Sequence, residues 1–335
     1  MLNSVSVIIP CHNEEKHIAD CLLSILNSDY PTDKIEILVI DGRSTDGTRQ
    51  IVMGYQKQSS NIKLIDNEKV HTQYGLNLGI DCAENELVMI ASAHSKFPSD
   101  YIQILVKQLI DLKTDVVGGV METCIKNSDG VSEAIVQVLS SRIGVGGSMF
   151  RLGVDHPTLV DTVPFGLYRK KLLKEIGGYD LRLRRNHDIE MSKRILAKGG
   201  KIHLVPDVSC TYFARETFTG LAKNNFENGY WNILTVYITK RFRSLSLRHF
   251  IPLIFVLSLL LPLCVALFFF PVIWIALFSL GAYLSVVLYA SSTMDKSKTN
   301  YVYLALAFFV LHFSYGFGSL FGLLRLDKLF QKQTS

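Results

Sequence analysis

The chain has 335 residues, of which 48% are hydrophobic and 19% are charged, and its 35 Lys and Arg against 30 Asp and Glu give a formal net charge of +5. This composition excludes an intrinsically disordered or collagen-like chain, and the weak, dispersed positive charge does not favour nucleic-acid binding. The six cysteines are scattered without a C-x-x-C pair, which argues against a zinc knuckle or a disulfide framework and indicates a reducing compartment.

The N-terminal part alternates between short apolar runs and segments of helix length. Short segments rich in apolar and β-branched residues at 5–9, 35–40, 62–65 and 87–90 are predicted strands, and the segment 20–26 has the apolar spacing of a helix. Such alternation predicts an α/β fold with a mostly parallel sheet covered by helices. Because ligands bind beyond the carboxyl ends of the strands in these sheets, the residues that follow each strand are the candidates for a binding site.

Polar residues follow three of the predicted strands. The segments are 11–14, 41–47 and 92–94. Taken singly, Asn13, Asp41 and Asp46 would serve equally well as turn or helix-cap residues, but their coincidence at strand ends favours a shared site. The first strand ends at Pro10 with no G-x-G-x-x-G or P-loop sequence after it, which argues against a dinucleotide-binding dehydrogenase.

Two of these segments carry motifs that resemble a known family. The strings SVIIPCHNEE (6–15) and VIDGRSTDGT (39–48) together resemble the opening of the family 2 glycosyltransferases, whose fold is the nucleotide-sugar-binding GT-A fold. Further matching strings lie at 75–80, 163–169, 176–180 and 186–190, so the resemblance covers residues 4–235. The string GVGGS (144–148) and the apolar C-terminal part make the chain most similar to the membrane-associated bacterial exopolysaccharide subgroup, which includes succinoglycan-type enzymes.

The resemblance implies an enzyme that transfers a sugar, with inversion, from a nucleotide-sugar donor that is most often UDP-linked. It implies that Asp41 contacts the base and that Pro10, His12 and Glu14 line the base and ribose. The other positions that match the family's nucleotide-sugar site are Asn13, Ser44, Asn77, Ser92, Ala93 and His94.

The chemistry of such a transfer needs one carboxylate that takes the proton of the acceptor hydroxyl, and positive charge or oriented donors that stabilise the departing diphosphate. Asp188 matches the family position of the catalytic base, although His187 stands before it where the family usually has Glu. Taken alone, Asp188 fits better as a helix-start residue bonded to free backbone amides. Glu190 is a further candidate, which would orient the base.

The segment after the fourth predicted strand departs from the family. Relatives normally carry Asp-X-Asp or Asp-Ala-His there to hold a divalent ion on the diphosphate, whereas this chain has Ser92, Ala93 and His94. The change removes a negative charge and an oxygen ligand of the kind that Mg²⁺ or Mn²⁺ prefers, so we expect weaker metal binding. His94 is a candidate metal ligand, a candidate cation for the diphosphate, or a simple strand-end cap.

Basic side chains offer a substitute for the lost metal charge. The candidates for the diphosphate are Arg43, Lys96, Arg169, Arg184 and Arg185. We therefore expect an enzyme that depends less on metal than its relatives. The alternative that follows from the same change is a catalytically degenerate, nucleotide-sugar-binding partner subunit.

The C-terminal part contains long apolar stretches. Residues 250–294 include no Asp, Glu, Lys, Arg or His, and a membrane helix needs about 20 apolar residues. We expect spans over 251–270 and 272–292, broken near Pro271, and a third apolar stretch over 301–323.

Basic residues flank these stretches on both sides. Lys240, Arg241, Arg243 and Arg248 precede the first stretch, which by the positive-inside rule places residues 1–249 in the cytoplasm. The run 5–10 is too short for a signal peptide, in agreement with this orientation. Basic residues after 323 oppose a simple three-span count, so the third stretch is left open as spanning, re-entrant or interfacial.

These observations predict a cytoplasmic GT-A domain over 1–235, a basic juxtamembrane segment over 236–249, a membrane region over 250–324 and a tail over 325–335. The Q-x-x-R-W signature of processive synthases does not occur. We expect a multi-pass inner-membrane enzyme that moves a sugar, non-processively, to a polyprenyl-linked saccharide in exopolysaccharide or cell-surface polysaccharide synthesis. A synthase that loads the sugar onto polyprenyl phosphate itself is the other alternative.

Overall fold

The computed structural model of the chain describes residues 3–325 and 327, which form two compact units. The first unit contains the described residues up to 122 together with 149–213, and the second contains 123–148 and the described residues from 214 onward. The predicted tail over 325–335 lies almost entirely outside the described residues.

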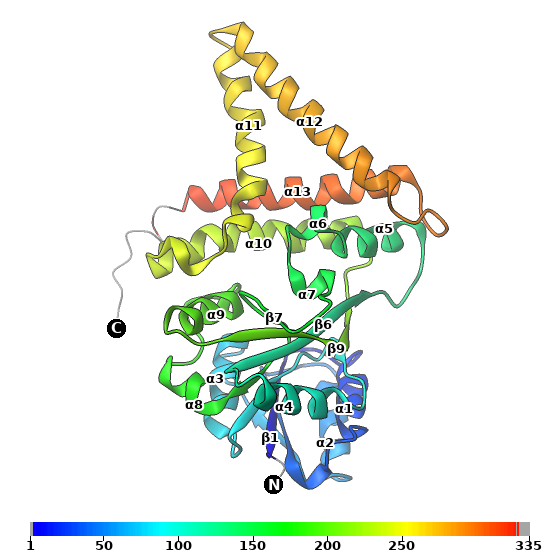
Figure 1. The fold of residues 1–335 in the computed structure, drawn as a ribbon, viewed down its shortest axis with the longest axis vertical. Coiled ribbons are helices and arrows are strands. Elements are labelled where there is room, and N and C mark those ends of the chain that lie inside the picture. Colours follow the sequence, from blue (N-terminus) through cyan, green and yellow to red (C-terminus); the bar gives the residue numbers. More distant parts are fainter. Residues whose placement is uncertain (1–2, 326, 328–335) are drawn as a thin grey trace. The chain divides into compact units, whose positions relative to one another are not determined.

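The first unit is built on a mixed sheet (Figure 1). Its strands are β1 (Val5–Cys11), β2 (Ile35–Asp41), β3 (Ile62–Asp66), β4 (Leu87–Ile90), β5 (Ser95–Lys96), β6 (Val116–Cys124), β7 (Thr158–Leu159), β8 (Leu167–Arg169) and β9 (Ile202–Phe213). They lie in the order β3-β2-β1-β4-β8-β6-β9-β5, and β7 pairs with β9. The strands β1 to β4 are parallel, as expected. The β8 strand, which is antiparallel to both β4 and β6, is too short for its periodicity to be visible in the sequence.

Helices cover both faces of this sheet. They are α1 (Ile18–Leu26), α2 (Thr48–Gln56), α3 (Thr72–Cys82), α4 (Tyr101–Asp111), α7 (Met149–Leu152), α8 (Lys170–Glu175) and α9 (His187–Ala197), with a 3-10 turn, η1, at Thr32–Lys34. Because successive side chains of a strand point to opposite faces, Val7 and Ile9 of β1 pack with α1, α2 and α4, whereas Ile8 packs with α3, α8 and α9. Burial on both faces explains why Val7, Ile8 and Ile9 of β1 are all apolar and do not alternate with polar residues.

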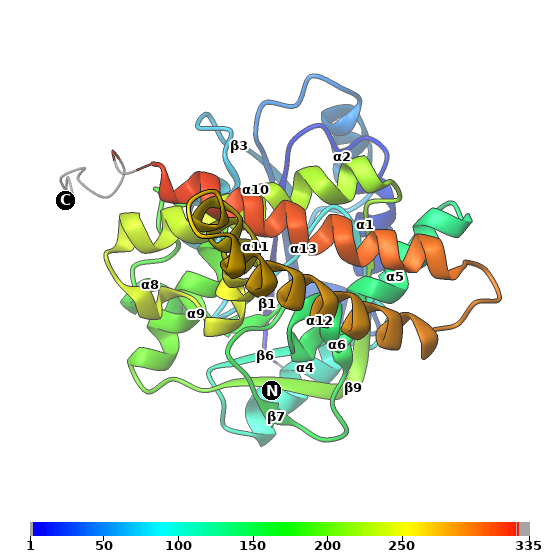
Figure 2. The same ribbon diagram turned by 90° about the horizontal axis from the view of Figure 1, so that it is seen from above.

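The second unit is helical. It consists of α5 (Gly130–Leu139), α6 (Arg142–Val145), α10 (Phe218–Thr239), α11 (Ile251–Ala266), α12 (Ile273–Ser292) and α13 (Tyr301–Leu323), with 3-10 turns η2 (Phe242–Ser244), η3 (Leu247–Phe250) and η4 (Phe270–Val272). Three of its helical segments, Leu247–Ala266, Phe270–Ser292 and Tyr301–Leu323, are long and apolar enough to cross a membrane. In Figures 1 and 2, α10 and α13 lie side by side and α11 and α12 form a hairpin.

The boundary between the two compact units does not coincide with the expected domain limit at residue 235. That residue lies within α10, which packs with α13 in the second unit, so the division falls after residue 213. Because compactness alone does not define an independent domain, the limits 1–235, 236–249 and 250–324 stay a prediction.

A glycine inside α3 allows that helix to approach β1. A Cβ at Gly79 would overlap Cγ2 of the fully buried Ile8. We predict that Gly79→Ala lowers the free energy of unfolding by about 1–3 kcal/mol, because overpacking outweighs the better helix propensity of Ala. The matched control is Gly54→Ala in α2, where nothing lies within 4 Å of the new Cβ and a gain of about 0.5–1 kcal/mol is expected. Thermal unfolding in detergent measures both, and equal stability of the two variants would contradict the packing assigned to α3.

Candidate active site

The loops that follow β1 and β2 are joined by hydrogen bonds. The amide of Thr45 donates to Oδ1 of Asn13 at 2.8 Å, and the amide of Asn13 donates to Oγ of Ser44 at 2.8 Å. The amide of Glu14 donates to Oγ1 of Thr48 at 2.7 Å. Asn13 adopts a φ of 56°, a conformation that Asn tolerates better than most residues. The two loops therefore form one rigid structure at the carboxyl edge of the sheet.

Asp41, at the end of β2, is fully buried beneath this structure. Its carboxylate accepts hydrogen bonds from the Ser44 amide at 3.2 and 3.3 Å and from Arg49 at 2.6 Å, and Arg49 also bonds Asp66 at 2.6 Å. Burial alone would raise the pKa of Asp41, but the hydrogen bonds from Ser44 and Arg49 outweigh it and hold the pKa below its usual value. Asp41 thus fixes the second loop, and contact with a nucleotide base stays a prediction for it.

Other residues predicted for the nucleotide-sugar site lie in or directly after β1 and β4. His12 places its Nδ1 2.6 Å from the carbonyl oxygen of Gly42, again between the two loops. Pro10 is half-buried in β1, and Ala93 is buried in the segment after β4. Ser92 accepts a hydrogen bond from the His94 amide at 3.3 Å, so its hydroxyl supports the turn in which His94 lies.

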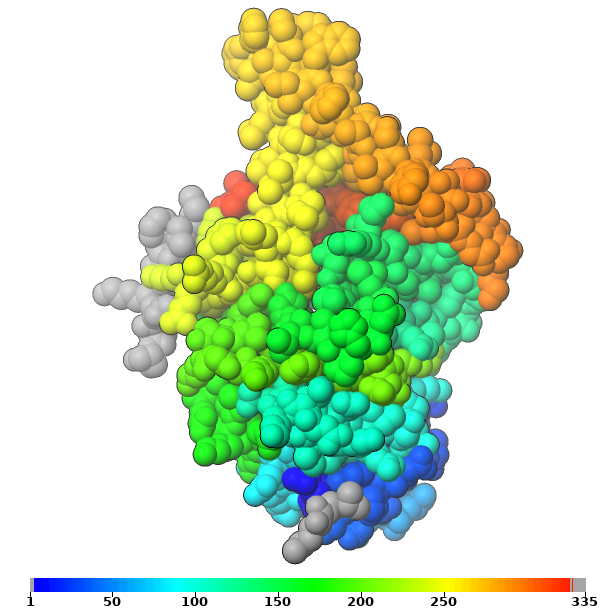
Figure 3. All heavy atoms as spheres, in the orientation of Figure 1, coloured from blue at the N-terminus to red at the C-terminus, as the bar shows by residue number. Residues whose placement is uncertain are grey.

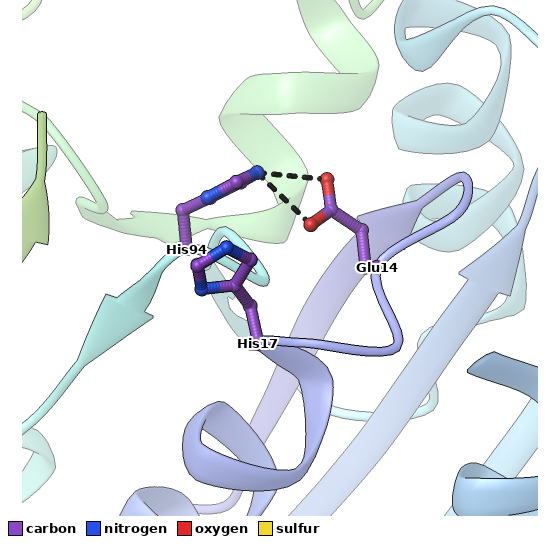
Figure 4. Close-up of side chains that lie close together, drawn as sticks. All are labelled: Glu14, His17 and His94. Atoms are coloured by element: carbon purple, nitrogen blue, oxygen red, sulfur yellow. Dashed lines mark hydrogen bonds and ion pairs between the residues drawn. The ribbon is translucent and has the colours of Figure 1, made fainter. Parts of the chain in front are cut away.

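Three side chains from separate elements converge above these loops (Figure 4). Nε2 of His94 lies 3.0 and 2.9 Å from the two carboxylate oxygens of Glu14, and the His94 and His17 ring centres are 4.2 Å apart. One nitrogen or oxygen from each of the three residues lies within 4.8 Å of the others. Glu14 follows β1, His17 directly precedes α1 and His94 follows β4. The parallel register of β1 and β4 brings these segments together.

This cluster fits a divalent transition ion. Two imidazoles and one carboxylate suit Mn²⁺ or Zn²⁺, whereas Mg²⁺ prefers oxygen ligands. Glu14 and His17 thus add two candidate ligand atoms beside His94. Sequence reasoning overlooked His17, although its spacing three residues after Glu14 was visible in the string CHNEEKH.

Asp188 lies in the first turn of α9 and is exposed to solvent. Burial, with a smaller contribution from the negative charge of Asp188, raises the pKa of the Tyr168 hydroxyl in β8. His187 packs against Tyr179, with ring centres 5.5 Å apart, and burial lowers its pKa. His187 is half-buried, and its imidazole adds no negative charge beside Asp188.

Two predicted site residues hold α9 and its preceding turn in place. Glu190 is buried and forms a two-pronged ion pair with Arg194, which donates to the carbonyl oxygens of Ile176 and Gly178 at 2.6 and 2.7 Å. Asn77 of α3 accepts from the Tyr179 amide at 2.8 Å and donates to its carbonyl at 2.9 Å. These contacts fix the segment that leads to Asp188, and direct ligand contact by either residue stays a prediction.

The predicted cationic residues lie in different parts of the first unit. Arg43 is exposed in the loop after β2, and Arg184 and Arg185 lie in the turn before α9. Lys96 pairs with Asp20 at 3.0 Å. Arg169 pairs in register with Leu87, the first residue of β4, which is the opposite end of that strand from Ser92 and His94. This position does not favour the role on the diphosphate that the sequence predicted for Arg169.

The sequence of the chain is similar to those of known proteins. Residues 6–177 match the family model described as Glycosyl transferase family 2. The chain is 30% identical over 254 residues to the dolichyl N-acetyl-alpha-D-glucosaminyl phosphate 3-beta-D-2,3-diacetamido-2,3-dideoxy-beta-D-glucuronosyltransferase of Methanococcus voltae, covering 70% of this chain and 78% of that protein. It is 28% identical over 250 residues to the succinoglycan biosynthesis protein ExoA of Rhizobium meliloti (strain 1021), covering 74% of each.

The fold has a counterpart among solved structures. The mannosyltransferase PcManGT of Pyrobaculum calidifontis, solved in complex with GDP-Man and Mn²⁺, matches with a TM-score of 0.61 at 20% identity, over 98% of this chain and 88% of that one. The sheet and its loops thus define a glycosyltransferase with the GT-A fold. The chain belongs to glycosyl transferase family 2, as its motifs indicated.

The ion pair of Asp41 predicts a pH-dependent stability. Because the folded state lowers the pKa of this carboxyl, its contribution is present above the usual value of about 4 and is lost as the pH falls through the folded value. We predict that Asp41→Asn destabilises the protein by about 1–3 kcal/mol near neutral pH and flattens the loss of stability in acid. Denaturant unfolding between about pH 3 and 7 measures both, with the exposed Asp33→Asn as control. An unchanged acid limb in the Asp41 variant would show that the ion pair does not contribute.

Proposed function

We propose that this protein is a membrane-bound, inverting and non-processive glycosyltransferase that moves a sugar from a UDP-linked donor to a lipid-linked saccharide, in exopolysaccharide or cell-surface polysaccharide synthesis. The observation that carries the proposal is the edge site, in which the joined loops after β1 and β2 lie beside the Glu14, His17 and His94 cluster. The name of the Methanococcus relative, which acts on a dolichyl-linked sugar phosphate, supports a lipid-linked acceptor.

The joined loops suit a nucleotide. Their backbone is held by cross-links such as those of Asn13 and Ser44, so binding costs little additional ordering. His12 and Glu14 add polar side chains to the loop after β1, and Pro10 lies near the end of that strand. We assign the nucleotide to this surface.

Asp188 is the base that we propose for the reaction. An exposed carboxylate in the first turn of α9 can accept the proton of an incoming hydroxyl. The bond from the acceptor oxygen to the sugar carbon forms as the bond from that carbon to the diphosphate oxygen breaks, and the negative charge passes to the diphosphate. The contacts of Glu190 and Asn77 keep the α9 segment fixed while this happens.

The leaving diphosphate needs compensating charge. Glu14, His17 and His94 would hold a divalent ion, which supplies that charge when bound. Without the ion, basic side chains would stabilise the leaving diphosphate, and we assign this role to Arg43, Arg184 and Arg185. Both features support weaker metal dependence than a site with two carboxylates would have.

The protein would act at the cytoplasmic face of the inner membrane. The run of basic residues over 240–248, which precedes the first apolar helix, supports this orientation. A lipid-linked acceptor then keeps its tail in the membrane while its saccharide reaches the enzyme from the cytoplasmic side.

Replacing the proposed base tests the function directly. We predict that Asp188→Asn lowers sugar transfer by about 10²–10⁴-fold, because proton abstraction is lost, and leaves nucleotide binding unchanged. A screen of nucleotide-sugar donors by nucleotide release identifies the donor, and thin-layer analysis of radiolabelled lipid from extracted membranes identifies the product. Asp33→Asn, before β2 at the opposite end of the sheet, is the matched control and should retain full activity.

Each alternative gives a different outcome in this experiment. Equal background activity in the wild type and the Asp188 variant would identify a degenerate partner subunit. A product in which the sugar sits directly on polyprenyl monophosphate would identify the synthase that loads the carrier. A ladder of long products from one acceptor would overturn the non-processive assignment.

The donor atoms of the cluster predict the metal response. We expect part of the turnover to survive chelation, Mn²⁺ to restore more of the loss than Mg²⁺, and His17→Ala to remove most of the Mn²⁺ response. Ser92→Asp should increase the response to Mg²⁺, because it restores an oxygen ligand. Turnover against metal concentration measures these effects, with the exposed His156→Ala as control. Complete loss on chelation with equal rescue by both ions would refute the weakened site.

A further inference from the structure

The apolar helix α13 is bound along its length to α10. Rings of Phe218 and Tyr303, at the starts of the two helices, lie 6.5 Å apart, and near their ends the Tyr237 hydroxyl donates to the Leu323 carbonyl at 3.3 Å. Between these points a Cβ at Gly318 would overlap the Phe226 carbonyl oxygen. The two helices therefore run parallel and in backbone contact, in the manner of small-residue helix packing.

α10 does not have the composition of a membrane-spanning helix. Its sequence includes Lys223 and Glu227, with asparagines at 224, 225, 228 and 232, and it is not among the three helical segments apolar enough to cross. Charged residues in a span are costly. Because α13 follows α10 from end to end, α13 could cross a membrane only if this charged helix crossed with it. We therefore infer that the pair lies along the membrane surface.

α11 and α12 extend away from this pair. In Figure 1 the two helices run crosswise to α13 and meet at their far end, and in Figure 2 α11 is seen nearly end-on above α13. Gly316 permits the Pro252 carbonyl at the base of α11 to contact α13, and Phe255 stacks on Tyr283 of α12 with ring centres 4.3 Å apart. The hairpin is thus attached to α13 at its base and uncovered beyond it, as the spheres of Figure 3 show.

The turn of the hairpin contains only apolar residues. Phe268 is 93% exposed and the neighbouring Leu267 82%. Three of the turn's amides nevertheless have internal partners: those of Phe268 and Phe269 donate to the Val265 carbonyl at 2.9 Å, and that of Val272 donates to the Phe269 carbonyl at 3.2 Å. Backbone groups must be satisfied internally in hydrocarbon, and apolar side chains must leave water. Both properties suit a turn that lies inside the bilayer.

The length of the hairpin and the charges at its base agree with this position. The 16 residues of α11 rise about 24 Å, which is less than the hydrocarbon thickness of about 30 Å. The 20 residues of α12 rise about 30 Å, but α12 runs obliquely from the far end of α11 (Figure 1), so α11 sets the depth of the hairpin. Basic residues flank the hairpin at both of its ends, and one follows α13. They are Lys240, Arg241, Arg243 and Arg248 before α11, Lys296 and Lys298 after α12, and Arg325 after α13. A three-span arrangement would place Arg325 on the opposite side from the others, whereas a hairpin leaves all of them on one side, facing anionic headgroups.

We propose that the second unit is a one-sided membrane anchor: the α11–α12 hairpin enters the bilayer and returns without emerging, while α10 and α13 lie in the interface. No described helix then delivers residues to the far side of the membrane. This arrangement differs from the multi-pass expectation, and in it the third apolar stretch is interfacial. It does not depend on the proposed enzymatic function, because anchoring is measured without turnover.

Cysteine accessibility in the full chain tests the anchor. In a background without the native cysteines, single cysteines replace Leu247, Phe268, Ser297 and Leu324, and a membrane-impermeant maleimide is applied to inside-out and right-side-out inner-membrane vesicles. We expect the cysteines at 247, 297 and 324 to react only in inside-out vesicles, and that at 268 to react in neither until detergent is added. Reaction at 268 in right-side-out vesicles would establish two full spans, and reaction at 324 there would establish that α13 crosses.

The depth of the turn provides a second, independent readout. A bimane probe attached at position 268 should be quenched most strongly by lipids labelled deep in the acyl chain, and one at 297 by lipids labelled near the headgroup. Strongest quenching of the 268 probe at headgroup depth would overturn the proposal. A disulfide-linked dimer through position 268 without lipid quenching would assign the turn to a second copy of the chain and overturn it equally.

Discussion

The parallel register of β1 with β2 and β4 is the constraint on which the candidate site depends. It places Cys11 opposite Asp41 and aligns β1 with β4, so the segments that follow all three strands leave the sheet at one edge. The two loops can then exchange hydrogen bonds, and Glu14 can reach His94 across 80 positions of sequence. A register shift of one residue would turn the β1 side chains to the opposite faces and separate these contacts.

The segment after β4 has Ser92 at a position where the resemblance implies a carboxylate ligand. Ser92 removes a carboxylate, and the structure offers Glu14 and His17 beside His94 instead. A set of two imidazoles and one carboxylate carries less negative charge than two carboxylates would, and this difference is the basis of the weaker metal dependence that we propose.

Close backbone packing determines how the helices of the second unit are arranged. Gly229, Gly316, Gly318 and Gly322 lie where α10, α11 and α13 touch, and a Cβ at any of them would overlap a neighbouring main-chain or side-chain atom. This contact holds an apolar helix against a charged one along its whole length. The direction of α13 within the second unit is thus set by its packing against α10, and the hydropathy of α13 alone does not determine it.

The sequence by itself determined the family, the parallel strands β1 to β4, the polar strand ends and the three apolar stretches, because periodicity and short motifs are local properties of the chain. It did not determine β8, whose three residues show no period, nor the contact of His17 with His94, nor the burial of Glu190 beneath Arg194. It predicted Arg169 for the site, whereas the antiparallel register places that residue at the other end of β4. Only the tertiary structure decided these points and the pairing of α13 with α10. Each of them depends on which distant segments lie side by side, and a local pattern of residues does not indicate which distant segment it will contact.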